Sequence, residues 1–95
     1  MSVPQMREYS DGSKVWWLNG KLHRTDGPAV EYSNGTKQWY LNGELHRTDG
    51  PAIEYPNSTK AWCLNGNEVT WFAVYCHNLR SGNIETAEQI LRMPK

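Results

Sequence analysis

The sequence is poor in aliphatic residues and has no net charge. Its 95 residues include seven Leu, three Ile, five Val and one Phe, whereas Trp and Tyr together number ten. Disordered chains combine few aliphatic residues with high net charge and few aromatics, but here ten Lys and Arg balance ten Asp and Glu. We therefore expect one folded chain with an aromatic core. The missing basic excess argues against a general binder of nucleic acid or membrane surfaces.

Long apolar segments and cysteines are also scarce. The longest apolar run, 71–76, is six residues long, whereas a membrane-spanning helix needs about 20. The first residues show no apolar stretch of the kind found in signal peptides. The only cysteines are Cys63 and Cys76, a number that favours reduced thiols, with a single pairing between them as the alternative. These absences predict a reduced, cytoplasmic protein without a membrane partner.

The chain does contain an internal repeat of constant period. Segments 9–20, 32–43 and 55–66 each begin with Tyr and end in Lys-x-Trp-x-Leu-Asn-Gly. The intervening segments 22–31 and 45–54 both read Leu-His-Arg-Thr-Asp-Gly-Pro-Ala-x-Glu and differ at a single position. Periodicity of this kind is typical of architectures that repeat one small structural unit.

Turn signals divide each copy into short strands. Asn-Gly at 19–20, 42–43 and 65–66 is typical of two-residue type I′ hairpin turns. Asp11-Gly12 and Asn34-Gly35 predict a second turn of the same kind, and 56–58 predicts a looser one. The proline of each Asp-Gly-Pro segment has no N–H to donate to a neighbouring strand. The sequence therefore predicts a mainly β fold, an antiparallel β-meander built from 23-residue hairpin repeats.

Two-residue loops also fix a predicted strand register. Around Asn42-Gly43, Tyr40 should face Leu45 and Trp39 should face His46. Around Asn34-Gly35, Val30 should face Trp39. Because opposed residues share a sheet face, one face should carry the core, with Val30, Tyr32, Trp39, Leu41 and His46. The other should carry the variable position occupied by Trp17, Tyr40 and Cys63.

The period ends after Gly66, and the pattern becomes helical. A helix is predicted from Trp71 to about Arg80 with Thr70 as its N-cap, and a second from Ile84 to about Met93. Repeat arrays need a terminal element that covers the last apolar face. The predicted organisation is a β-hairpin repeat region over 1–66 and a short α-helical C-terminal cap over 67–95.

The repeated unit resembles the MORN-like short β-hairpin repeats. The resemblance is to a variant with a Leu-Asn-Gly-x-Leu-His-Arg-x-Asp-Gly-Pro-Ala core, common in bacteriophage and bacterial proteins, and it covers residues 6–66. Ordinary MORN units have more glycines and lack the His-Arg-x-Asp-Gly-Pro segment. The resemblance implies an elongated, twisted antiparallel sheet that binds a partner, and it brings no catalytic residue to this chain.

The two His-Arg-x-Asp segments contain the most chemically versatile side chains. In a structural role, each His would form a hydrogen bond with a neighbouring turn. Each Asp would accept a hydrogen bond from an adjacent Thr or from the amides of its turn. Each Arg would then pair with the following Glu (Glu31 or Glu54) or lie over the aromatic face. The alternative is that these side chains line a binding strip. The side chains concerned are His23, Arg24 and Asp26, with His46, Arg47 and Asp49 in the second copy.

Catalysis and metal binding find little support in these segments. His23 and His46 belong to equivalent positions about four strands apart, which at roughly 4.8 Å per strand separates them by more than about 10 Å. Asp26 and Asp49 are spaced in the same way, so they do not form a convergent carboxylate pair. We expect no enzymatic activity, no metal and no cofactor.

Two functional classes remain. The favoured one is a non-enzymatic protein-interaction module, a small phage-type inhibitor or adaptor that binds and occludes a host protein. The alternative is binding of single-stranded nucleic acid or a nucleotide through an exposed aromatic β-surface. Open sheet edges also allow a homo-oligomer. The candidate binding residues are Trp17, Tyr40, His23, Arg24, Asp26, His46, Arg47 and Asp49.

Overall fold

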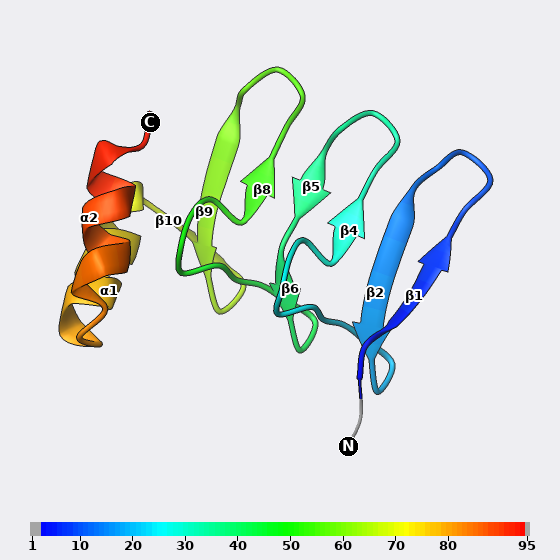
Figure 1. Ribbon diagram of the computed structural model, residues 1–95, viewed down its shortest axis with the longest axis horizontal. Coiled ribbons are helices and arrows are strands. Elements are labelled where there is room, and N and C mark those ends of the chain that lie inside the picture. The colour runs from blue at the N-terminus through cyan, green and yellow to red at the C-terminus, as the bar shows by residue number, and fades with distance from the viewer. Residues whose placement is uncertain (1–2, 95) are drawn as a thin grey trace.

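The computed structural model describes residues 3–94 and shows a mainly β chain with two short helices at the C-terminal end (Figure 1). An eight-stranded antiparallel sheet runs in the order β1-β2-β4-β5-β8-β9-β10, with β3 beside β2, and β6 and β7 form a separate pair. This confirms the mainly β prediction. The strands are β1 (Gln5–Glu8), β2 (Lys14–Leu18), β3 (Lys21–Leu22), β4 (Val30–Glu31), β5 (Lys37–Gln38), β6 (Tyr40–Leu41), β7 (Glu44–Leu45), β8 (Ile53–Glu54), β9 (Lys60–Leu64) and β10 (Asn67–Val69).

The Asn-Gly turns have the predicted type I′ geometry. Asn19, Asn42 and Asn65 all have φ of 52°, and the glycine after each is also in the left-handed region. Type I′ turns need positive φ at both central residues, a requirement that Asn and Gly meet at low cost. Around the second of these turns Tyr40 lies opposite Leu45, as predicted.

The other hairpin turns are one residue longer than predicted. The Tyr32 N–H donates to the Thr36 carbonyl (2.9 Å), and the Gly35 N–H donates to the Tyr32 carbonyl (3.0 Å). These bonds enclose a three-residue loop, 33–35, whose last residue has φ of 95°, the geometry of a type I turn followed by a bulge. The prediction that Val30 faces Trp39 is therefore wrong, because Val30 faces Gln38.

The third copy forms this longer turn without a glycine. Ser58 has φ of 72° in the place of Gly35. The Tyr55 N–H donates to the Thr59 carbonyl at 2.9 Å, as in the second copy. The looser turn predicted over 56–58 is thus absent, and the serine instead takes on a left-handed conformation that costs roughly 1–2 kcal/mol for a residue with a Cβ.

Because this loop is one residue longer than predicted, the side chains of residues 30–32 point to the opposite face of the sheet from the one predicted. A one-residue change of register exchanges the two faces of a strand. We call the side that carries Trp16, Trp39 and Trp62 the tryptophan face; of these indoles, Trp62 is buried. Ala29 and Ala52, both fully buried, lie at the bends that precede β4 and β8. The opposite face carries Val30 and Ile53, which are 4% and 9% exposed. The core is therefore divided between both faces.

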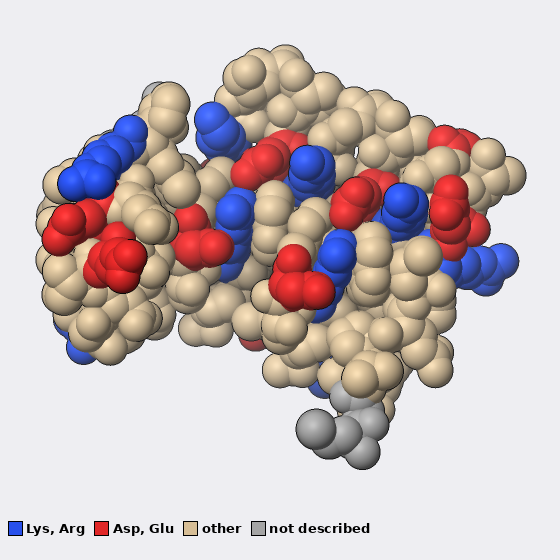
Figure 2. Space-filling view, in the orientation of Figure 1, with Lys and Arg blue, Asp and Glu red and all other residues tan. Residues whose placement is uncertain are grey.

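A ladder of alternating charge crosses the tryptophan face. Each acidic residue lies opposite a lysine of the next strand, and Figure 2 shows this alternation as a band of red and blue side chains. Opposite charges on facing residues stabilise antiparallel pairs by about 0.2–1 kcal/mol each and favour one register. In order across the sheet, the ladder consists of Glu8, Lys14, Glu31, Lys37, Glu54 and Lys60.

Two helices pack at the end of the sheet formed by β9 and β10. They are α1 (Trp71–Arg80) and α2 (Ile84–Arg92), close to the predicted bounds. The Thr70 hydroxyl accepts a bond from the Ala73 N–H (3.2 Å), which confirms the predicted N-cap. Trp62 packs against Val74 of α1 and Ile90 of α2 in one buried cluster.

Two further properties concern the described residues 3–94 as a whole. Neither helix among them has the length and apolar character required to cross a membrane. Cys63, which is buried, and Cys76, which is partly buried, are both free thiols.

Candidate functional site

The two copies of the His-Arg-Thr-Asp-Gly-Pro segment fold into the same loop. In the first, Arg24 Nε donates to Asp26 Oδ1 at 2.9 Å, and Nη1 donates to the Pro28 carbonyl at 3.1 Å and to Glu31 at 3.2 Å. In the second, Arg47 makes the corresponding bonds to Asp49, Pro51 and Glu54 at 2.8, 3.0 and 2.9 Å. The predicted Arg–Glu pairs are present. Each Asp, however, accepts from its Arg rather than from the adjacent Thr.

Each guanidinium is also stacked between an indole and a glycine. Arg24 Cζ lies 3.8 Å from the ring centroid of Trp16, and Arg47 Cζ lies 3.9 Å from that of Trp39. On the other side, a Cβ added to Gly50 would stand only 2.8 Å from Arg47 Cζ. A side chain at this position would displace the guanidinium from its place over the indole. The cation–π contact and the ion pairs together fix each loop on the tryptophan face.

The histidines link each loop to the next Asn-Gly turn. His23 Nδ1 accepts from the Asn42 N–H at 3.0 Å, and His46 Nδ1 accepts from the Asn65 N–H at 2.9 Å. This is the neighbouring-turn bond expected from the sequence. An accepting Nδ1 carries no proton, so the imidazole in this arrangement is the neutral form protonated at Nε2.

Protonation of His46 should weaken the fold. Burial, together with the nearby His77, lowers the pKa of His46 below its usual 6.5, and Glu44 opposes the shift only in part. As the pH falls through 6.5, the unfolded chain takes up the proton first. The stabilisation that neutral His46 contributes is therefore complete above pH 6.5 and is lost as the pH falls towards the pKa of His46 in the folded state. We expect the urea-unfolding free energy to fall more steeply between pH 7.5 and 5 in the wild type than in His46→Gln. Equal slopes in the two proteins would contradict this assignment.

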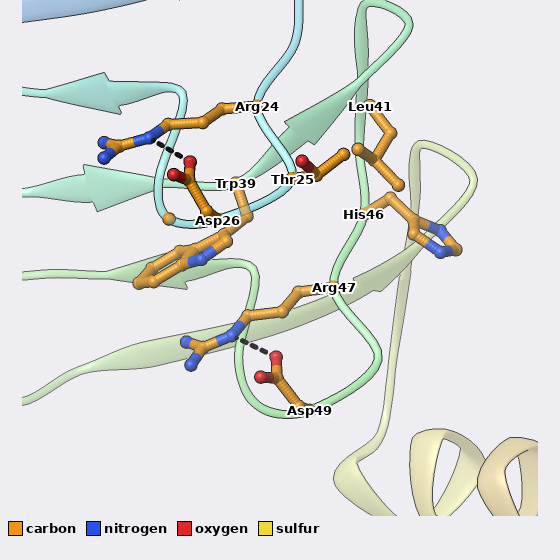
Figure 3. Close-up of a pocket in the computed structure, with 9 residues that line it drawn as sticks. Arg24, Thr25, Asp26, Trp39, Leu41, His46, Arg47 and Asp49 are labelled. Atoms are coloured by element: carbon orange, nitrogen blue, oxygen red, sulfur yellow. Dashed lines mark hydrogen bonds and ion pairs between the residues drawn. The ribbon is translucent and has the colours of Figure 1, made fainter. Parts of the chain in front are cut away.

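A groove opens on the tryptophan face between the two loops. It has a volume of about 400 Å³. Figure 3 shows Trp39 between the Arg24–Asp26 and Arg47–Asp49 pairs, with Leu41 and His46 farther along the same depression. The Asp26 and Asp49 side chains are 83% and 65% exposed, so their carboxylates are open to a ligand. The pKa of Asp26 is held below its usual range by the hydrogen bond and the charge of Arg24.

The groove brings together some of the candidate residues and leaves others outside. Its lining includes Arg24, Asp26, His46, Arg47 and Asp49, together with Thr25, Gly27, Trp39 and Leu41, which sequence reasoning had not assigned to a site.

Three candidate residues lie elsewhere. His23 belongs to the first loop, where it holds the Asn42 turn. Trp17 lines a separate depression with Val3 and Gln5. Tyr40 precedes the groove residue Leu41 in β6 and so points to the opposite face, where burial raises the pKa of its hydroxyl. The predicted binding residues therefore do not form one continuous surface.

The chain itself fills the counterpart of this groove in the next copy of the repeat. There Trp62 takes the place of Trp39, but Thr70 stands where Arg47 stands, so no guanidinium covers the indole. Val74 of α1 packs on Trp62 instead, and the Asn78 side-chain amide donates to the Thr48 carbonyl at 2.7 Å. Thr48 is the equivalent of Thr25 in the open groove. In this copy, where no arginine covers the indole, the site accepts the face of α1 that carries Val74 and Asn78.

The acidic, histidine and cysteine side chains of residues 3–94 form no group of three or more that could hold a metal ion. Comparison with known proteins adds no relative: no protein-family profile, no curated protein and no solved structure matches the chain.

Proposed function

We propose that this protein is a non-enzymatic interaction module that binds a protein partner in the groove between the two arginine loops. The observation that carries the proposal is the filled counterpart of that groove, where α1 docks on Trp62 and Thr48. A site type that accepts a helix of the same chain is suited to a helix of another. The module acts by occlusion: it covers the surface of the partner that it binds, and that surface is then blocked.

The proposed architecture follows from the same equivalence. We propose that residues 1–66 are an array of MORN-like hairpin repeats and that residues 67–95 are its cap. The cap covers Trp62, while Trp39 remains half-buried in the open groove. In keeping with the resemblance to repeats of phage proteins, the proposed role is a small inhibitor or adaptor that acts on a host protein in the cytoplasm.

The groove favours a partner that brings hydrogen-bond donors. Its walls offer the exposed carboxylates of Asp26 and Asp49, and Thr25 is exposed beside them. By analogy with Asn78 on Thr48, the proposed partner helix donates a side-chain amide to the Thr25 carbonyl. Arg47 covers the ring of Trp39, so this helix lies against the guanidinium and the loop walls rather than directly on the indole.

Nucleic-acid binding receives less support. The lysines of the tryptophan face alternate with glutamates, and both groove arginines are paired with carboxylates. A polynucleotide needs uncompensated positive charge along its path. We therefore retain the protein-binding proposal alone.

A blocking substitution tests the groove. Thr25→Arg places a long side chain in it, and Thr59→Arg adds the same charge at an exposed hairpin tip outside it. We expect the tagged wild type and Thr59→Arg to capture one stoichiometric protein from host-cell extract, with and without nuclease, and Thr25→Arg to lose it while melting at the same temperature. Capture that is abolished by nuclease, or that is equal for all three proteins, would overturn the proposal.

A further inference from the structure

The outer edge of β1 has no partner strand within residues 3–94, although its counterparts in the other copies are covered. β4 pairs with β2 on one side and β5 on the other, and β8 pairs with β5 and β9. β1 stands at the end of the sheet and pairs only with β2. Met6 and Glu8 of β1 occupy the positions that Ala29 and Glu31 hold in the next copy.

The main chain of β1 can form hydrogen bonds with another strand. The Tyr9 N–H donates to the Ser13 carbonyl at 2.8 Å. Hydrogen-bonded and non-hydrogen-bonded pairs alternate along an antiparallel ladder, so the N–H and C=O groups of Met6 and Glu8 point away from β2. At the equivalent edge the Ala29 carbonyl accepts from the Trp16 N–H at 2.8 Å, whereas the Ala29 N–H donates to the Gln38 carbonyl of β5 at 2.8 Å, so Ala29 is a precedent for the Met6 carbonyl only. All four residues of β1 are exposed.

The charge ladder is incomplete at the same edge. Glu31 lies between Lys14 and Lys37 and also bonds to Arg24. Glu8 has Lys14 on one side only. Apolar surface accompanies this open position, because Val3 is 72% exposed and Met6 is 49% exposed.

We propose that the edge of β1 is a second binding site, which takes an extended, antiparallel peptide segment with the pattern basic-x-apolar. The basic residue lies opposite Glu8 and extends the ladder, and the apolar residue lies opposite Met6. This is the register that Lys14 and Trp16 adopt beside β4. Strand addition of this kind gains affinity from main-chain bonds and specificity from alternate side chains.

The occupant is a segment of a partner protein and not a second copy of this chain. The three Lys-x-Trp segments of the chain begin in β2, β5 and β9, and each of these strands is already paired on both sides. The site is separate from the groove, so it does not depend on the proposed function above.

A synthetic peptide tests the site with the intact protein. The probe is a labelled peptide with the sequence of residues 36–43, Thr-Lys-Gln-Trp-Tyr-Leu-Asn-Gly, which carries the required pattern. Met6→Pro removes an outward N–H while leaving the bonds to β2, and Met6→Ala is its matched control. We expect fluorescence anisotropy to show binding to the wild type and Met6→Ala, and about tenfold weaker binding to Met6→Pro. Equal binding by Met6→Pro would overturn the site.

A charge exchange tests the register. Changing the peptide lysine to glutamate should weaken binding to the wild type about three- to tenfold, and Glu8→Lys should reverse the preference between the two peptides. Thr25→Arg should bind the probe normally, which separates this site from the groove. If both peptides bind Glu8→Lys as they bind the wild type, the register is wrong. If sedimentation shows that the free protein dimerises and that Met6→Pro does not, a second copy occupies the edge, and the partner assignment is overturned.

Discussion

Trp62→Ala should destabilise the protein by about 3–5 kcal/mol, the usual cost of removing a buried tryptophan side chain. Trp62 is 7% exposed and joins the sheet to both helices through Val74 and Ile90. A domain of this size has a total stability of about 5–15 kcal/mol, so much of it would be lost. Urea unfolding followed by far-UV circular dichroism measures the change without relying on tryptophan fluorescence.

The matched control is Trp17→Ala, which removes the same side chain from the half-buried position in β2. Its cost should be clearly smaller because less of the indole leaves water on folding. Comparable losses for the two variants would show that the contact between Trp62 and the helices adds nothing beyond ordinary burial of an indole in the sheet.

Arg47→Ala should cost about 2–4 kcal/mol. Its side chain is 18% exposed, stacks 3.9 Å from the Trp39 centroid and bonds to Asp49, Glu54 and the Pro51 carbonyl. Hydrogen bonds to charged groups are worth about 1.5–3 kcal/mol and the cation–π contact about 0.5–2 kcal/mol, partly offset by solvent around the carboxylates. Arg47→Lys should recover only a minor part, because an ammonium cannot reproduce the planar set of donors. Chemical denaturation of both variants provides the measurement.

Arg7→Ala serves as the control for the arginine series. Arg7 also stands over an aromatic ring, 5.1 Å from the Tyr9 centroid, but β1 is exposed throughout. Its removal should change stability by no more than about 0.5 kcal/mol, as is usual for surface positions. The loop would not depend on its guanidinium if Arg47→Ala unfolded at the same urea concentration as Arg7→Ala.

The local turns and helices of this chain could be predicted because their signals are short-range. Asn at 19, 42 and 65 has the positive φ that its pairing with glycine predicts, and Thr70 caps α1 as expected. Asn34-Gly35 looks identical in sequence but forms the end of a three-residue loop. The dipeptide alone does not distinguish the two loop lengths. The third copy holds the missing signal, since Asn57-Ser58 lacks the glycine of a type I′ turn.

The candidate site was predictable in its residues but not in its grouping. The Arg–Glu pairs and the histidine bonds to a neighbouring turn follow from the sequence pattern. The alternation of faces along a strand does not extend to Arg47, because β7 ends at Leu45. Tyr40 and Trp17 were therefore grouped with the arginine loops, from which the sheet separates them. Gly27 and Gly50 each lie against a guanidinium. This contact could not be predicted, because the only sequence signal at these glycines is the Asp-Gly-Pro turn.

The hydrogen bonds between adjacent copies of the repeat span less than one 23-residue period of the chain. His23 and His46 each reach a partner 19 residues ahead, and the Ser13 hydroxyl meets the Ser33 N–H 20 residues ahead. Each copy therefore interacts with the next and requires nothing more distant. A duplicated copy would find its usual partners on both sides, so such a gene could gain or lose copies without redesign of the remainder. The length of the proposed binding surface would then evolve independently of its chemistry.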